Sequence, residues 1–223
     1  MNKAVLLFAL AGACLASDQQ RVKIASTDEF TFAPGGTIEI RDSFGEVKIE
    51  AWDRDVVELR IVKKTQKKYE LSEEAEARRQ LERVHVTTTL ESASRLVIET
   101  EFPSRNLFKR PLRGKSNLDL EYRIRVPRNT RLDIRHDIGE VVIAGIAGDI
   151  RVTNRIGAIA LKVPPDATYS VDARARIGDV SSDFDPQARR KMLLGASLVG
   201  DGLARHRIFA RVGIGEITVR RAD

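Results

Sequence analysis

A short glycine-centred pattern occurs six times along the chain. In each copy an apolar residue precedes the glycine, an acidic residue or alanine follows it, and aliphatic residues come next. The six glycines are Gly45, Gly139, Gly148, Gly157, Gly178 and Gly215. The second, third and fourth are nine residues apart, which indicates that one structural unit is being repeated.

Around these glycines apolar residues fall at every second position, which is the side-chain period of a strand with one buried face. Glycine before a strand suits a sharp corner, where a positive φ or a closely approaching neighbour excludes other residues. Short strands cannot bury a face singly, but stacked copies build a continuous core. We therefore expect an all-β, single-domain β-solenoid (β-helix-like) over residues 18–223. A meandering antiparallel sandwich is the alternative.

The nine-residue spacing makes a specific prediction about burial. If the three glycines mark equivalent corners, the aliphatic residue two positions after each one is buried, and the acid after the first two is exposed. The predicted buried residues are Val141, Ile150 and Ile159, and the predicted exposed acids are Glu140 and Asp149.

Before residue 130 the alternation is less regular. Strands are expected over residues 37–40, 46–51, 56–63, 84–90, 96–102 and 118–126. One short helix is expected near residues 72–84, with Ser72 as its cap. Ala77, Leu81 and Val84 share one face of that helix, which we expect to lie against the sheet.

Residues 1–17 have the pattern of a secretory signal peptide: Lys3, an apolar stretch over 4–13 that is too short to span a bilayer, and then small residues. Residues 11–14 resemble a bacterial lipobox, in which Cys14 becomes a lipidated N-terminus. Cleavage after Ala16 or Ser17 is the alternative. Cys14 is the only cysteine, so no disulfide is expected in the exported chain. The expected location is the periplasm, the outer membrane or the exterior, with no transmembrane helix in the mature chain.

The order of these segments resembles the DUF4097 family of adhesin-like bacterial envelope proteins. A strand ending in Val126-Pro127 is followed by units such as Gly139-Glu140-Val141, Gly148-Asp149-Ile150 and Gly215-Glu216-Ile217. The resemblance covers roughly residues 35–220. Family members commonly have Asn or Ser before the glycine, where this chain has Ile. The resemblance implies a β-solenoid and an envelope location.

The sequence carries no catalytic or metal-binding motif. His85, His136 and His206 lack metal-ligand spacing, and no serine lies in a Gly-x-Ser-x-Gly elbow. We therefore expect a non-catalytic protein with no metal and no cofactor. The alternative is a polysaccharide-active enzyme on a β-solenoid, which needs two carboxylates ~5–10 Å apart.

Charge indicates the class of partner. The formal net charge is +6 and the pI is near 9.6, which favours anionic partners. Residues 104–116 contain no acid, and a contact between this loop and an anionic lipid or glycan is predicted; an ordinary solvated loop is the alternative. The predicted contact residues are Arg105, Lys109, Arg110, Arg113 and Lys115. Nucleic acid is not expected as a partner, because no recognition motif is present. The function expected from the sequence is an adhesin-like binding module or structural surface of the cell envelope.

Overall fold

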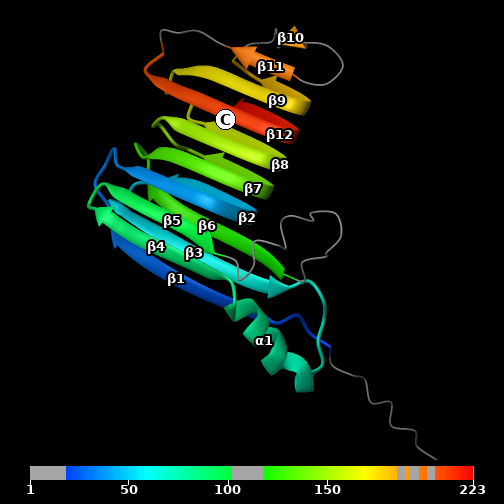
Figure 1. Ribbon diagram of the computed structural model, residues 1–223. Helices are drawn as coiled ribbons and strands as arrows, with labels where there is room; N and C mark the ends of the chain where they lie inside the picture. Colours follow the sequence, from blue (N-terminus) through cyan, green and yellow to red (C-terminus); the bar gives the residue numbers. More distant parts are fainter. Residues whose placement is uncertain (1–18, 102–117, 185–188, 191–195, 200–203, 223) are drawn as a thin grey trace, which may run out of the picture.

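The computed structural model describes residues 19–101, 118–184, 189–190, 196–199 and 204–222. In these residues nearly all regular structure belongs to one large sheet, with one short helix beside it (Figure 1). The all-β class with a single short helix is confirmed. The predicted signal peptide, Cys14 and the basic loop over 104–116 lie outside the described residues.

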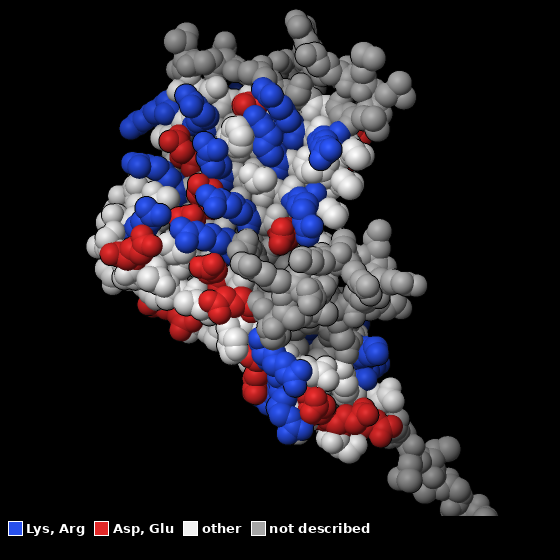
Figure 2. Space-filling model, in the orientation of Figure 1, with Lys and Arg blue, Asp and Glu red and all other residues white. Residues whose placement is uncertain are grey.

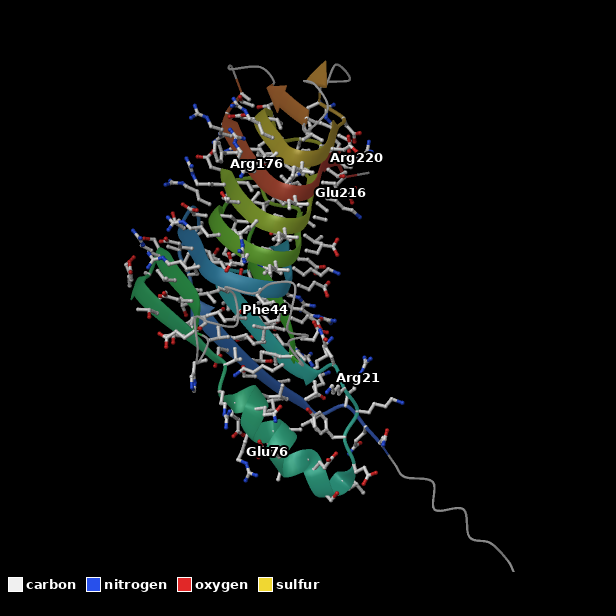
Figure 3. All side chains as sticks on the ribbon, turned by 45° about the vertical axis from the view of Figure 1, so that its right-hand side comes forward. Arg21, Phe44, Glu76, Arg176, Glu216 and Arg220 are labelled. Carbon is white, nitrogen blue, oxygen red and sulfur yellow. The ribbon has the colours of Figure 1, made fainter. Side chains whose placement is uncertain are left out.

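Five long parallel strands form the centre of the sheet, and each bends at a glycine. In spatial order they are β2 (Thr37–Trp52), β7 (Arg131–Ala144), β8 (Ile150–Val163), β12 (His206–Arg221) and β9 (Tyr169–Ser182). Each strand has a first half before its glycine and a second half after it. Figure 3 shows the resulting curvature of the stacked strands.

The bends stack into a ladder of five glycines: Gly45, Gly139, Gly157, Gly215 and Gly178. Their φ angles lie between 92° and 145°, a region that disfavours residues with a Cβ. A Cβ at Gly157 would lie 1.9 Å from the carbonyl oxygen of Gly139. The ladder therefore requires glycine both for backbone conformation and for contact between neighbouring strands.

Gly148 differs from the other five glycines and corrects the predicted spacing. It lies between β7 and β8, its φ is not positive, and its Cβ would meet the carbonyl oxygen of Thr130 at 2.2 Å. Leu132 is the register partner of Ile150, so the repeat from β7 to β8 is eighteen residues long rather than nine. Nine residues correspond to half of this repeat.

The burial prediction holds despite the longer repeat. Val141, Ile150 and Ile159 are at most 1% exposed, and Glu140 and Asp149 are exposed. Both halves of each strand alternate with period two and turn aliphatic side chains towards the same interior. Residues from first and second halves accordingly belong to one core cluster.

The strand order departs from a coil built in chain order. Only β7 and β8 are consecutive both in sequence and in the parallel stack, because β12 lies between β8 and β9 and pairs with both (Figure 1). Beyond β9, the short strands β11 (Ala196–Val199) and β10 (Arg189–Arg190) continue the sheet in antiparallel fashion.

At β2 the sheet divides between two groups of strands. The first half of β2 pairs with β5 (Arg95–Glu101), which pairs with β4 (His85–Ser92). The second half pairs with β6 (Leu118–Pro127), followed by β3 (Val56–Thr65) and β1 (Lys23–Thr31). Strand β1 was not predicted, because its side chains are mostly exposed and show no clean alternation.

The helical segment begins with a 3₁₀ turn, η1 (Leu71–Glu73), and continues as α1 (Glu74–Glu82). The predicted cap is wrong: Glu70 is the N-cap of η1 and forms a capping box with Glu73, so Ser72 does not cap the helix. The predicted apolar face is confirmed, because Ala77, Leu81 and Val84 are all buried. Ala77 and Leu81 pack with Val22 of the segment before β1.

Candidate anion-binding face

The outer surface of the first halves of β7, β8 and β12 carries two arginines on each strand, four residues apart. Figure 2 shows Lys and Arg side chains gathered over these strands and β9, with fewer acids between them. Period two explains the pattern: apolar residues such as Leu132 and Ile134 turn inward, and the residues between them face solvent.

Four arginines and one aromatic residue line a single open depression of ≈ 490 Å³ on this surface. We call Arg131, Arg151, Arg205, Arg207 and Phe209 the arginine face. Two acids, Asp133 and Asp149, line the same depression, so its formal charge remains positive. An adjoining depression of ≈ 470 Å³ shares Arg131 and Arg205 and lies beside the loops between the strands.

Phe209 is half-buried on the outer side of β12, between two arginines. The guanidinium carbon of Arg211 lies 3.8 Å from the ring centroid, and that of Arg151 lies 4.6 Å away. These cation–π contacts hold both side chains against the sheet. A guanidinium that is fixed by stacking loses less conformational entropy when its N–H groups bind an anion.

Two acids near the arginine face are already neutralised by other arginines. Glu39 accepts hydrogen bonds from Arg41 Nε at 2.8 Å and from Arg95 Nη2 at 3.0 Å, and these contacts lower the pKa of the Glu39 carboxyl despite its burial. Asp172 pairs with Arg211 at 2.5 Å and with Arg174 at 3.2 Å.

The arginine face itself is left without such partners. Among the described residues, no carboxylate lies within 4.0 Å of the guanidinium groups of its four arginines, and none of these groups donates a hydrogen bond to another side chain. Asp149, one of the two acids in the lining, accepts a hydrogen bond from the backbone N–H of Arg207 at 2.9 Å. The four guanidinium groups therefore keep their donors available to an external anion.

Two polar side chains, His136 and Asn154, lie inside the bend and are too buried for a ligand to reach them. His136 is 4% exposed, and its Nε2–H donates to the carbonyl oxygen of Gly45 at 3.1 Å, while Ser43 Oγ–H donates to Nδ1 at 2.7 Å. On the next strand Asn154 Nδ2 donates to the Gly139 carbonyl at 2.9 Å. Both side chains satisfy carbonyls of the glycine ladder. Burial lowers the pKa of His136 to about 4, so the ring is neutral.

The structure brings together residues that the sequence analysis did not select as a site. The predicted anionic contact was placed in the loop over 104–116, outside the described residues, and not at Arg131, Arg151, Arg205 or Arg207. The alternation of arginine with aliphatic residues in β7, β8 and β12 was the available signal. The three histidines do not gather: within the described ranges, no group of three or more His, Cys, Asp or Glu is arranged to hold a metal ion.

Comparison with known proteins gives structural matches only. No protein-family model and no curated protein matches this sequence. A solved structure of a putative cell adhesion protein from Clostridium sporogenes matches at 11% identity and a TM-score of 0.48, covering 89% of this chain and 100% of that chain. A putative adhesin from Bacteroides fragilis matches at 9% identity and a TM-score of 0.30, covering 89% and 97%. A putative lipid binding protein from Parabacteroides distasonis matches at 8% identity and a TM-score of 0.24, again covering 89% and 97%.

No helix within the described part of the chain has the length and apolar character needed to cross a membrane.

Proposed function

We propose that this protein is a non-catalytic binding module whose arginine face binds an anionic component of the cell envelope. The observation that carries this proposal is the depression lined by Arg131, Arg151, Arg205 and Arg207, whose guanidinium groups have no carboxylate partner among the described residues. Arginine presents a planar array of donors that matches carboxylate and phosphate oxygens. Acidic glycans and anionic lipid headgroups share this chemistry.

The predicted location, the family resemblance and the solenoid-like architecture are part of the same proposal. We place the protein outside the cytoplasm, as an adhesin-like module of the DUF4097 type with a β-solenoid-like stack of bent parallel strands. The glycine ladder over β2, β7, β8, β12 and β9 supports the stacked architecture. Mass spectrometry of the mature N-terminus tests export: we expect a lipidated Cys14 or a start near Asp18, and unprocessed cytoplasmic protein would contradict both.

A binding role also fits the carboxyl groups better than catalysis does. A glycosidase needs a general acid whose pKa is raised. Contacts with arginine or lysine instead lower the pKa of four carboxyl groups: Glu39, Glu76, Glu121 and Asp183. The depressions on the outer face are open, and arginine predominates among their charged lining residues.

The test compares two variants with equal loss of positive charge. The first changes Arg131, Arg151 and Arg207 to Ser. The control changes Lys48, Arg60 and Lys162, which lie on β2, β3 and β8 away from the arginine face, to Ser. Binding is measured to vesicles containing anionic lipid and, separately, to an acidic polysaccharide. The two probes distinguish the two sources of anion.

We expect the arginine variant to bind one of the probes at least about tenfold more weakly, since each basic residue near an anionic surface contributes about 1 kcal/mol. The control is expected to keep most of its affinity. Equal losses in both variants would show that net charge alone attracts the anion, and no binding by the unmodified protein would overturn the proposal.

A further inference from the structure

The outer side of the bend carries a row of isoleucines. The residue before each ladder glycine is isoleucine in four of the five strands, and these four are aligned in register: Ile138, Ile156, Ile214 and Ile177. Ile214 is 49% exposed and Ile177 is 44% exposed, which makes them two of the most exposed large apolar residues described. We call this row the isoleucine ridge. The fifth strand has Phe44 at this position, partly packed against the core.

Cross-strand contacts between the isoleucines stabilise the sheet. Ile177 and Ile214 remain exposed at one end of the row, and Ile138 and Ile156 are half-buried. A contiguous apolar strip on a charged surface is typical of an interaction site. Its charged borders indicate which partner fits.

The two borders of the ridge carry opposite charge. On the side of the first halves lie five arginines: Arg135, Arg155, Arg174, Arg176 and Arg211. Asp133, Asp137 and Asp172 also lie on this side. Asp137 is paired with Arg155, and Asp172 with Arg174 and Arg211, whereas Arg176 has no carboxylate within 4.0 Å among the described residues. On the side of the second halves, directly after the glycines, lie Glu46, Glu140, Glu216 and Asp179. Figure 3 labels Arg176 and Glu216 on the two sides of the bend.

We propose that the isoleucine ridge is the interface of a parallel homodimer. A two-fold axis running along the ridge places the isoleucines of two copies against each other and turns the basic border of each copy towards the acidic border of the other. An axis across the ridge would bring like charges together. The opposite charges of the two borders therefore favour a second copy in one orientation. In that orientation Arg176 of each copy faces Glu216 and Asp179 of its partner.

The size of the ridge sets the expected strength of this dimer. Four isoleucines on adjacent strands span about 14 Å, since neighbouring strands lie about 4.8 Å apart. A row of this length is short for a standard interface, which buries roughly 800 Å² per partner. We therefore expect a reversible dimer whose population rises with protein concentration. The interface uses none of the residues that define the arginine face, so this inference does not depend on the proposed function.

The first experiment removes the apolar contact. Sedimentation velocity over a wide range of concentrations compares the unmodified protein with a variant carrying Ile177→Ser and Ile214→Ser. A control carries Leu71→Ser and Leu90→Ser, which are also exposed but lie away from the ridge. Because all four side chains are exposed, the thermal midpoints should stay close. We expect the ridge variant to dimerise at least about tenfold more weakly and the control to match the unmodified protein.

The second experiment tests orientation by mixing two charge-reversed proteins. Arg176→Glu alone and Glu216→Arg alone should each be monomeric, because each homodimer brings like charges together. Their equimolar mixture should dimerise, because the heterodimer pairs Glu at 176 with Arg at 216 across the interface and retains the native pair. A mixture that stays monomeric would refute the two-fold along the ridge. An unmodified protein that remains monomeric, or a ridge variant that loses vesicle binding rather than dimerisation, would overturn the dimer itself.

Discussion

His136 shows how a single side chain can make the whole fold sensitive to acid. Its ring is held neutral in the folded protein with a pKa of about 4, whereas an unfolded histidine has a pKa of 6.5. Because the folded pKa is depressed, the stabilisation is fully present above pH 6.5 and is lost as the pH falls towards 4. The difference corresponds to about 3 kcal/mol of unfolding free energy across that window.

We therefore expect urea unfolding to report a loss of stability between pH 6.5 and 5, before the carboxyl groups of Glu39 and Glu121, whose pKa values are lowered, become protonated. The matched variant is His136→Asn, since Asn154 performs the same task on the next strand by donating to a glycine carbonyl. This variant should lose most of the pH dependence in that window. A parallel decline in both proteins would assign the effect to another group.

At the scale of strands, the glycine ladder is what allows the bent elements to stack. Gly157→Ala would place a Cβ 1.9 Å from the Gly139 carbonyl oxygen, at a φ of 132°. We expect at least about 3 kcal/mol of destabilisation in thermal or urea unfolding, from backbone strain and steric overlap together. Gly35→Ala is the control: its φ is 75°, but nothing lies within 4 Å of the added Cβ, so about 1 kcal/mol is expected. Equal losses would mean that conformation alone demands glycine.

The strands could be predicted from the sequence, but their pairing could not. Alternating aliphatic residues correctly placed β3, β4, β5 and β6, because period two is a local signal. The position of β12 between β8 and β9 had no such signal, since all three strands carry the same Ile-Gly pair and each matches the others in register. The nine-residue spacing was misleading, because half-repeats and full repeats bury aliphatic residues alike.

The candidate site illustrates the same limit. The arginines of β7, β8 and β12 were visible in the sequence as solvent-facing residues, but nothing local places Arg131 beside Arg207. Their gathering depends on parallel pairing between strands far apart in the chain. Phe209 could not be predicted as a site residue either, because an outward-facing aromatic residue indicates a site only once Arg151 and Arg211 are seen to stack on it.

At the scale of the whole molecule, the two proposed surfaces differ in charge: the arginine face holds four arginines without a carboxylate partner among the described residues, and acids follow the ladder glycines at the start of the second halves. The proposed anion-binding surface has arginines around Phe209, whereas the proposed dimer interface has a row of isoleucines at its centre. Ionic strength should separate the two activities. Attraction between exposed charges weakens as the screening length shortens to about 8 Å at physiological salt, while apolar contact is not screened.

Raising sodium chloride from low to moderate concentration should thus weaken binding to anionic vesicles or acidic polysaccharide about tenfold or more, and dimerisation by a much smaller factor. The two variants test this separation. The protein with Ile177 and Ile214 changed to Ser should still bind anions, and this binding should still weaken with salt. The protein with Arg131, Arg151 and Arg207 changed to Ser should still dimerise, with little change in the dimerisation constant as salt rises. Sedimentation velocity and vesicle co-sedimentation on the same samples measure both. If the two activities fell together in either variant, one shared surface would have to carry both, and the separation of the arginine face from the isoleucine ridge would be wrong.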